Sequence, residues 1–207
     1  MRLILASASP RRRELLRDAG YAFDVDPAHV DESEAAGEAP RDYVRRVAAL
    51  KARAVAARHP GRAVLAADTT VVVDALMLAK PVDDDDARRM LRLLSGRAHV
   101  VLTAVVVCAA GGEWSEVAES RVRFRALDPD DIDWYVATGE PHDKAGAYAV
   151  QGLAARFVDA VEGSYSNVVG LPVGVVRGLL ATAGVRPADA ARAASWREPA
   201  RFDRTGD

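Results

Sequence analysis

Short apolar runs alternate with amphipathic helical patterns along this chain, and this alternation limits the folds open to it. The apolar runs fall at residues 2–6, 63–74, 98–110 and 114–127. The helical patterns fall at residues 10–19, 40–58, 83–96, 128–138 and 173–184. Short buried runs are typical of strands, and an apolar stripe at helical spacing is typical of amphipathic helices. The sequence therefore predicts an α/β protein with a central mixed sheet and helices on both faces.

The first apolar run leads into an unusual loop, because residues 4–16 read ILASASPRRRELL. Ser9 suits the N-cap of the following helix, and Pro10 suits its first position. Backbone N–H groups at a helix N-terminus can hold an anion, and the forked donors of Arg11–Arg13 suit phosphate oxygens. Cations at this end of a helix oppose its dipole, so an anion is the expected neighbour. A solvated basic turn is the alternative interpretation.

Composition narrows the class of protein. The 207 residues suit one α/β domain or two small lobes, and the formal net charge of -2 does not indicate a nucleic-acid or membrane-surface binder. No apolar run approaches the ~20 residues of a membrane span, and the N-terminus lacks a signal-peptide pattern. Cys108 is the single cysteine, which excludes an intrachain disulfide and a thiolate metal site. We therefore expect a cytoplasmic protein.

Candidate chemistry begins at Asp68, which is expected at the end of an apolar strand. A carboxylate there costs stability unless it is hydrogen-bonded, paired or metal-bound, and α/β sheets place their sites at strand carboxyl ends. The alternating segment YAFDVDPAHV, residues 21–30, is expected to form a second strand, and Glu32 follows it and could reach the same place. Lys51 and Lys80 could then bind phosphates around a cation held by the carboxylates. The alternatives are an N-capping aspartate and two solvated lysines.

The segment 135–152, YVATGEPHDKAGAYAVQG, has the densest set of polar and glycine residues. Its glycines, which allow a close approach of backbone to a ligand, are Gly139, Gly146 and Gly152. The amide of Gln151 can both donate and accept, which suits the edge of a nucleobase. Gln151 could equally tie down the backbone of the loop. By contrast, the run Asp83–Asp86 is expected to cap a helix and form its first turn, not to bind a metal.

Seven segments, read together, identify a family resemblance. They are ASASPRRRELL, LKARAVA, AADTTVVVD, AKP, LSGRAHVVLTAV, GEPHDKAGAYAVQG and GSYSNVVGLP. In this order they resemble the Maf family of nucleoside triphosphate pyrophosphatases, from about Leu3 to Leu180. Ala79 departs from the residue, often glycine, that the family has before Lys-Pro. The tail of residues 186–207 lies outside the resemblance, and its composition predicts little order.

The resemblance implies a fold and an activity. The implied fold is an elongated α/β mixed sheet flanked by helices, similar to that of the inosine triphosphate pyrophosphatases, in one domain over residues 1–185 with two lobes around a cleft. The implied reaction is hydrolysis of nucleoside triphosphates to monophosphate and pyrophosphate, which would clear non-standard or excess nucleotides. The implied cofactor is a divalent cation, Mg²⁺ or Mn²⁺. A homodimer is implied, with a nucleoside triphosphate as substrate and neither nucleic acid nor membrane as partner.

The resemblance also implies roles for single residues. Asp68 matches the catalytic carboxylate, and Glu32 with Asp68 matches the carboxylates near the cation. The positions that match phosphate contacts are Ser7, Arg12, Lys51 and Lys80. The positions that match substrate choice are Arg11, Thr69 and Gln151, and these residue types resemble the branch that acts on dTTP and UTP.

Three other functions stay open at this point. The chain could belong to the branch that acts on 7-methyl-GTP, or it could be a phosphate-donor transferase. It could also be a nucleotide-binding regulator without catalysis, since the family is linked to septum formation. A carboxylate aimed at the α-phosphate favours an enzyme, because a binding protein has no need of one.

Overall fold

The computed structural model describes residues 3–198, which form two compact units. The first unit contains residues 3–68, 103–118 and 170–198, and the second contains residues 69–102 and 119–169. Three long strands contribute residues to both units: β3 (Val64–Val73), β5 (Ala98–Ala109) and β6 (Gly112–Phe124).

The remaining elements each belong to one unit. Those of the first unit are β1 (Leu3–Leu5), α1 (Pro10–Asp18), β2 (Phe23–Val25), α2 (Pro40–Ala56), α6 (Val173–Thr182) and α7 (Ala190–Ser195). Those of the second unit are β4 (Leu76–Leu78), α3 (Asp84–Leu94), α4 (Pro129–Ala137), the 3-10 helices η1 (Glu140–Asp143), η2 (Ala145–Ala147) and η3 (Leu153–Phe157), β7 (Val158–Glu162) and α5 (Tyr165–Val169).

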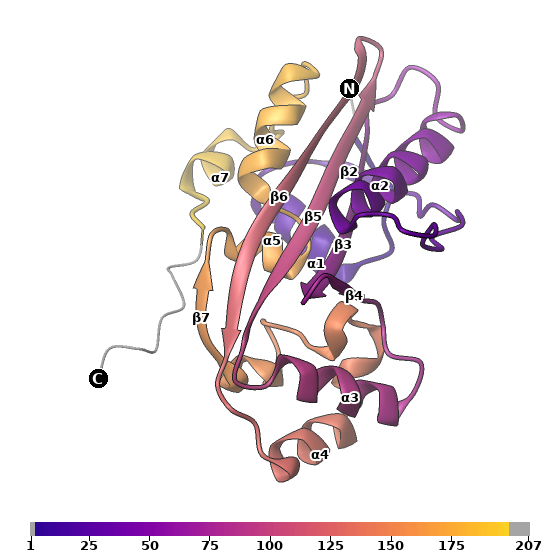
Figure 1. The fold of residues 1–207 in the computed structure, drawn as a ribbon. Coiled ribbons are helices and arrows are strands. Elements are labelled where there is room, and N and C mark those ends of the chain that lie inside the picture. Colours follow the sequence, from indigo (N-terminus) through magenta and orange to yellow (C-terminus); the bar gives the residue numbers. More distant parts are fainter. Residues whose placement is uncertain (1–2, 199–207) are drawn as a thin grey trace. The chain divides into compact units, whose positions relative to one another are not determined.

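The strands form one mixed sheet of seven, in the order β2-β1-β3-β5-β6-β7, with β4 paired to β3. β1 runs parallel to β2 and β3, whereas β3–β4 and β6–β7 are antiparallel. β5 and β6 lie side by side as two long strands (Figure 1). The predicted fold class, a mixed sheet flanked by helices, is confirmed.

Local sequence signals explain where the helices begin. The Ser9 side chain accepts a hydrogen bond from the N–H of Arg12 at 3.4 Å, so Ser9 caps α1 as predicted. Asp83 caps α3 by accepting from the N–H of Asp86 at 2.8 Å, with further acidic residues in the first turn. The prediction that the acidic run is a helix start is therefore confirmed.

Each unit has its own apolar core. In the first unit the core is formed by buried side chains of β1, α1, α2 and β3, including Leu5, Leu16, Val47 and Leu65. In the second unit an aromatic cluster dominates. Its members are His99, Phe124, Tyr135, Tyr148 and Phe157. α3 and α4 of this unit pack against one another (Figure 1).

The expected disordered tail differs from the structure over its first part. α7 lies within it, and the N–H of Asp189 donates to the Gly20 carbonyl at 3.0 Å. Gly20 has a φ of +87°, and a Cβ there would lie 2.5 Å from the Asp189 carbonyl oxygen and 3.0 Å from the Ala193 Cβ. Only glycine therefore lets the helix dock here. Residues 199–207 of the expected tail lie outside the described residues.

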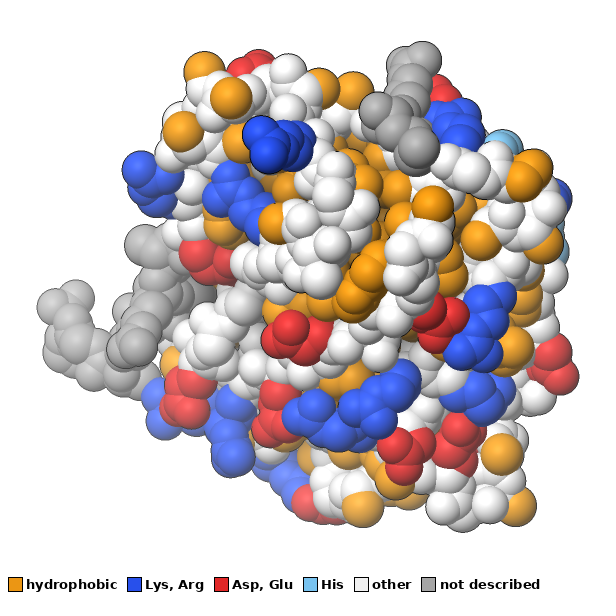
Figure 2. Space-filling view, turned by 90° about the horizontal axis from the view of Figure 1, so that it is seen from above, with side chains coloured by type: hydrophobic (Ala, Val, Ile, Leu, Met, Phe, Trp, Pro, Cys, Tyr) orange, Lys and Arg blue, Asp and Glu red, His pale blue; other side chains and the backbone are white. Residues whose placement is uncertain are grey.

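Charged side chains of both signs are interleaved over the face drawn in Figure 2. Many arginines in the structure have a carboxylate partner, as Arg46 has in Glu38 and Arg53 has in Glu113. Within residues 3–198, no helix combines the length and the apolar character that crossing a membrane requires.

Candidate active site

Asp68 lies inside β3, not at its end as the sequence suggested, because the strand continues to Val73. Its side chain is buried, and the Nζ of Lys51 lies 2.8 Å from Asp68 Oδ1. Lys51 itself lies on the buried face of α2. The position inside a strand rules out an N-capping aspartate, and the ion pair supplies the partner that a buried carboxylate needs.

The same ammonium also binds the second predicted carboxylate. Lys51 Nζ lies 2.7 Å from Glu32 Oε2, in the loop that precedes α2. Asp68 is nearly inaccessible, whereas the Glu32 side chain is 48% exposed. The cluster of Lys51, Glu32 and Asp68 is therefore shielded from solvent at Asp68 and open to it at Glu32. The two carboxylates converge on a single cationic atom.

Tyr43 is a member of this neighbourhood that the sequence analysis missed. Its hydroxyl donates to the backbone carbonyl of Glu32 at 3.0 Å, which holds the loop against α2. Burial, with the nearby charges of Asp68 and Glu32, raises the pKa of Tyr43 to about 12. Tyr43 precedes Lys51 by two helical turns and thus lies on the same side of α2. That spacing was the available signal.

The loop after β1 brings Ser7 and Arg12 together. The buried Ser7 hydroxyl accepts from the N–H of Ser9 at 3.2 Å and from Arg12 Nη1 at 3.3 Å. Arg12 Nε donates to the carbonyl of Gly170 at 2.8 Å. Burial lowers the pKa of Arg12, and the negative charges of Asp68 and Glu32 act against this shift. The guanidinium is thus held in one orientation and experiences both carboxylates.

The structure therefore gathers five predicted site residues within the first unit: Ser7, Arg12, Glu32, Lys51 and Asp68. Arg11 also belongs to this unit, where it lies half-buried on α1. Its positive charge contributes to the lowered pKa of Arg12.

The other three predicted residues belong to the second unit. Thr69 follows Asp68 directly in β3 and is half-buried. Lys80 is exposed in the segment after β4, and Gln151 is exposed in a turn. The N–H of Gly152 donates to the Ala149 carbonyl at 3.0 Å and closes this turn, which places Gln151 at its tip.

The donor set around Lys51 suits a hard divalent cation. Among residues 3–198 there is no cluster of three or more His, Cys, Asp or Glu side chains able to hold a metal by themselves. Glu32 and Asp68 supply two convergent carboxylates, and Mg²⁺ is commonly held by one or two carboxylates with substrate phosphates and waters completing its shell. The residues present therefore fit a cation that is shared with a phosphorylated ligand.

Beside the buried Asp68 carboxylate lie an arginine and the N-terminus of a helix, which are two kinds of group that bind phosphate in proteins. The family model described as Maf-like protein matches residues 2–183. The chain belongs to the Maf family.

Named relatives cover nearly the same length. A dTTP/UTP pyrophosphatase of Anaeromyxobacter dehalogenans is 57% identical over 187 residues, which is 88% of this chain and 94% of the relative. A dTTP/UTP pyrophosphatase of Koribacter versatilis is 52% identical over 185 residues, or 89% of this chain and 96% of that protein. The solved structure of the Staphylococcus aureus Ham1 protein matches with a TM-score of 0.48 and 14% identity, covering 88% of this chain and 99% of that chain.

Proposed function

We propose that this chain is a nucleoside triphosphate pyrophosphatase that hydrolyses dTTP and UTP to the monophosphate and pyrophosphate. The observation that carries this function is the buried Asp68 carboxylate, bound to Lys51 beside Glu32 and Arg12. The relatives named dTTP/UTP pyrophosphatase, at 57% and 52% identity, support the same reaction. We also propose that the catalytic domain spans residues 1–185 and that the protein acts in the cytoplasm as a homodimer.

Phosphate binding falls to the cationic and hydroxyl side chains. Arg12 presents a planar fork that matches phosphate oxygens, and its contacts with Ser7 and Gly170 fix its direction before the substrate arrives. Lys51 and Lys80 add positive charge, and Ser7 adds a hydroxyl. Because Ser7, Arg12 and Lys51 are already held by contacts within the protein, less ordering of these side chains is needed when the substrate binds.

Glu32 and Asp68 would hold a divalent cation, Mg²⁺ or Mn²⁺. Such a cation offsets phosphate charge and lowers the pKa of a bound water. Asp68 is assigned the role of orienting the attacking water, since the Lys51 ammonium already holds its carboxylate in one position.

The reaction breaks one phosphoanhydride bond. The water oxygen forms a bond to the α-phosphorus, and the bond from this phosphorus to the bridging oxygen of the β-phosphate breaks. The electron pair leaves with pyrophosphate, and the proton of the water passes to solvent. Arg12 and the lysines offset the negative charge that develops on the leaving oxygen, which is the main contribution of a protein to this class of reaction.

Base selection is assigned to Gln151, with Arg11 and Thr69. Thymine and uracil present a carbonyl, a ring N–H and a second carbonyl. One amide can donate to a carbonyl and accept from the ring N–H at the same time. A site built on such polar contacts rejects a mismatched base strongly, since its own groups are left unpaired. We expect dTTP and UTP to be the best substrates, CTP weaker, and ATP and GTP poorest.

A pyrophosphate-release assay tests the function. The purified full-length protein is incubated with dTTP, UTP, CTP, ATP, GTP and 7-methyl-GTP, each with Mg²⁺ or Mn²⁺ and each with excess chelator. Release of pyrophosphate from dTTP and UTP, lost with chelator, is the expected result. Faster hydrolysis of 7-methyl-GTP would overturn the substrate assignment alone. Nucleotide binding without any pyrophosphate release would overturn the enzymatic function.

A further inference from the structure

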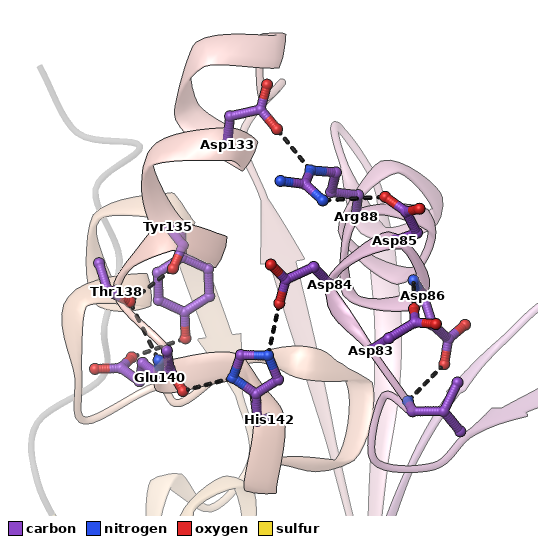
Figure 3. Close-up of polar contacts among 12 residues, drawn as sticks. Asp83, Asp84, Asp85, Asp86, Arg88, Asp133, Tyr135, Thr138, Glu140 and His142 are labelled. Carbon is purple, nitrogen blue, oxygen red and sulfur yellow. Dashed lines mark hydrogen bonds and ion pairs between the residues drawn. The ribbon is translucent and has the colours of Figure 1, made fainter.

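The carboxylate of Glu140, in the second unit, accepts hydrogen bonds from the backbone at one end of the turn that carries Gln151. Glu140, the first residue of η1, accepts from the N–H of Leu153 at 3.0 Å and from the N–H of Ala154 at 3.4 Å. It also accepts from the hydroxyl of Tyr135 on α4 at 2.7 Å. Figure 3 shows the phenol and the carboxylate pointing toward one another. All three donors meet the same carboxylate.

The Tyr135 hydroxyl reaches the other side of the same turn. It accepts from the N–H of Ala149 at 3.2 Å while it donates to Glu140. Tyr135 is fully buried, and this burial together with the Glu140 hydrogen bond raises the pKa of the phenol. The phenol thus stays protonated and keeps its donor. The pair of Tyr135 and Glu140 therefore binds backbone N–H groups both before and after Gln151.

Gly152 shows how close this contact is. A Cβ at this position would lie 2.3 Å from each of the two carboxylate oxygens of Glu140. The φ of Gly152 is -108°, which any residue can adopt, so the requirement for glycine is space for the carboxylate. A third contact comes from Tyr165, whose hydroxyl donates to the Val150 carbonyl at 3.3 Å. The turn is held at residues on both sides of its tip.

We propose that Tyr135 and Glu140 are positioning residues that set base selectivity by fixing the turn that carries Gln151. The inference rests on the proposed function, in which the Gln151 amide reads the base. A donor and an acceptor can discriminate between bases only if their positions are held to within about 0.5 Å. The tip of an exposed turn does not supply this by itself, whereas buried hydrogen bonds at both of its ends do.

Two mild variants test the proposal. Glu140→Gln keeps the shape but exchanges one acceptor oxygen for an amide group, and Tyr135→Phe removes only the hydroxyl. In each, the ratio of kcat/KM for dTTP to that for CTP should fall by about fivefold, the size expected for one lost hydrogen bond. The change should appear in KM for dTTP, while kcat for CTP stays within about twofold. The amides of Leu153 and Ala154 should exchange hydrogen at least about tenfold faster in Glu140→Gln.

Matched controls and a double variant separate positioning from general loss of structure. Glu113→Gln disturbs a carboxylate bound by Arg53 in the first unit, and Tyr21→Phe alters another buried tyrosine there; both should keep the wild-type ratio. Glu140→Gln added to Gln151→Ala should cause no further fall in the ratio, because both changes act through one amide.

Several results would overturn the proposal. An equal loss on every nucleotide, an unchanged ratio despite faster exchange, or a ratio unaltered by Gln151→Ala would each do so. If the wild-type protein releases no pyrophosphate at all, the proposed function fails with the selectivity claim. The exchange rates of Leu153 and Ala154 would still show whether Glu140 holds the turn, so the two failures are distinguishable.

Discussion

The Lys51 ammonium lies 2.8 Å from Asp68 Oδ1, and both side chains are buried in the first unit. Since the same ammonium also binds Glu32, one ammonium is shared by two carboxylates, and the Arg12 guanidinium is a second cation close to both of them. A buried carboxylate held in this way depends on its cationic partners for its contribution to stability.

Asp68→Asn keeps the shape of the side chain and removes its charge. Turnover of dTTP should fall at least ~100-fold, the range found for groups that position or activate a reacting water. Nucleotide binding, measured by calorimetry, should persist because the phosphate-binding residues remain. Near-normal turnover in the folded variant would move the catalytic role to another residue.

Lys51→Met leaves Asp68 buried without its ammonium. The free energy of unfolding, measured by urea denaturation, should fall by about 3–5 kcal/mol, because an unpaired buried charge remains. Lys80→Met is the matched control, since Lys80 is exposed, and should change stability by less than about 0.5 kcal/mol. Adding Asp68→Asn to Lys51→Met should restore part of the loss. Wild-type stability in the single variant would contradict the pairing.

Arg12→Ala tests both a substrate contact and a structural one. The value of kcat/KM should fall ~100-fold, equal to about 2.7 kcal/mol, because charge-assisted contacts strengthen as the leaving oxygen gains charge. The position of Arg12 near a helix N-terminus alone predicts flat or slightly higher stability without ligand. The hydrogen bond to the buried Gly170 carbonyl reverses this expectation, and we expect a loss of about 1 kcal/mol in thermal or urea unfolding. Lost stability with unaltered kinetics would make the residue structural only.

His142 gives the second unit a pH dependence. Its Nε2 lies 2.7 Å from Asp84 Oδ1 and its Nδ1 lies 3.0 Å from the Gly139 carbonyl oxygen (Figure 3). Only a ring that is protonated at both nitrogens can donate both of these hydrogen bonds. The hydrogen bond to Asp84 is the main cause of a raised His142 pKa. The stabilisation is therefore complete below the ordinary pKa of about 6.5 and is lost as pH rises through the higher folded-state value.

The melting temperature of His142→Gln should accordingly lie below that of the wild type near pH 5.5 and approach it near pH 9. Asp84→Asn should show the same narrowing gap, since it removes the partner. A gap that widens with pH would mean that the neutral ring is the stabilising form.

Apolar periodicity predicted the elements well where burial decides them. The expected strand over 63–74 corresponds to β3 at Val64–Val73, and the expected helix over 40–58 corresponds to α2 at Pro40–Ala56. The second strand was expected from a longer alternating segment but covers only Phe23–Val25. Periodicity records which side chains are buried, and it says less about where backbone pairing stops.

The sequence predicted that Lys51, Glu32 and Asp68 would gather in one place, but it did not predict how they pair. Spacing places Lys51 on one side of α2, but the distance to Asp68 depends on how the helix packs against β3. Tyr135 and Glu140 were missed because, apart from each other, their partners are backbone N–H groups, which no residue type in the sequence reveals. The ordered part of the tail was missed for a related reason. Its residues are mostly small or polar, and α7 docks because Gly20 leaves room for Asp189 and Ala193.

The contact between Glu140 and Gly152 also limits how this sequence can vary. A side chain at position 152 requires Glu140 to move or a shorter residue at position 140, so substitutions at position 152 depend on the residue at position 140. A directed-evolution library that aims at new base preferences should therefore diversify the exposed Gln151 and sample positions 140 and 152 as a linked pair.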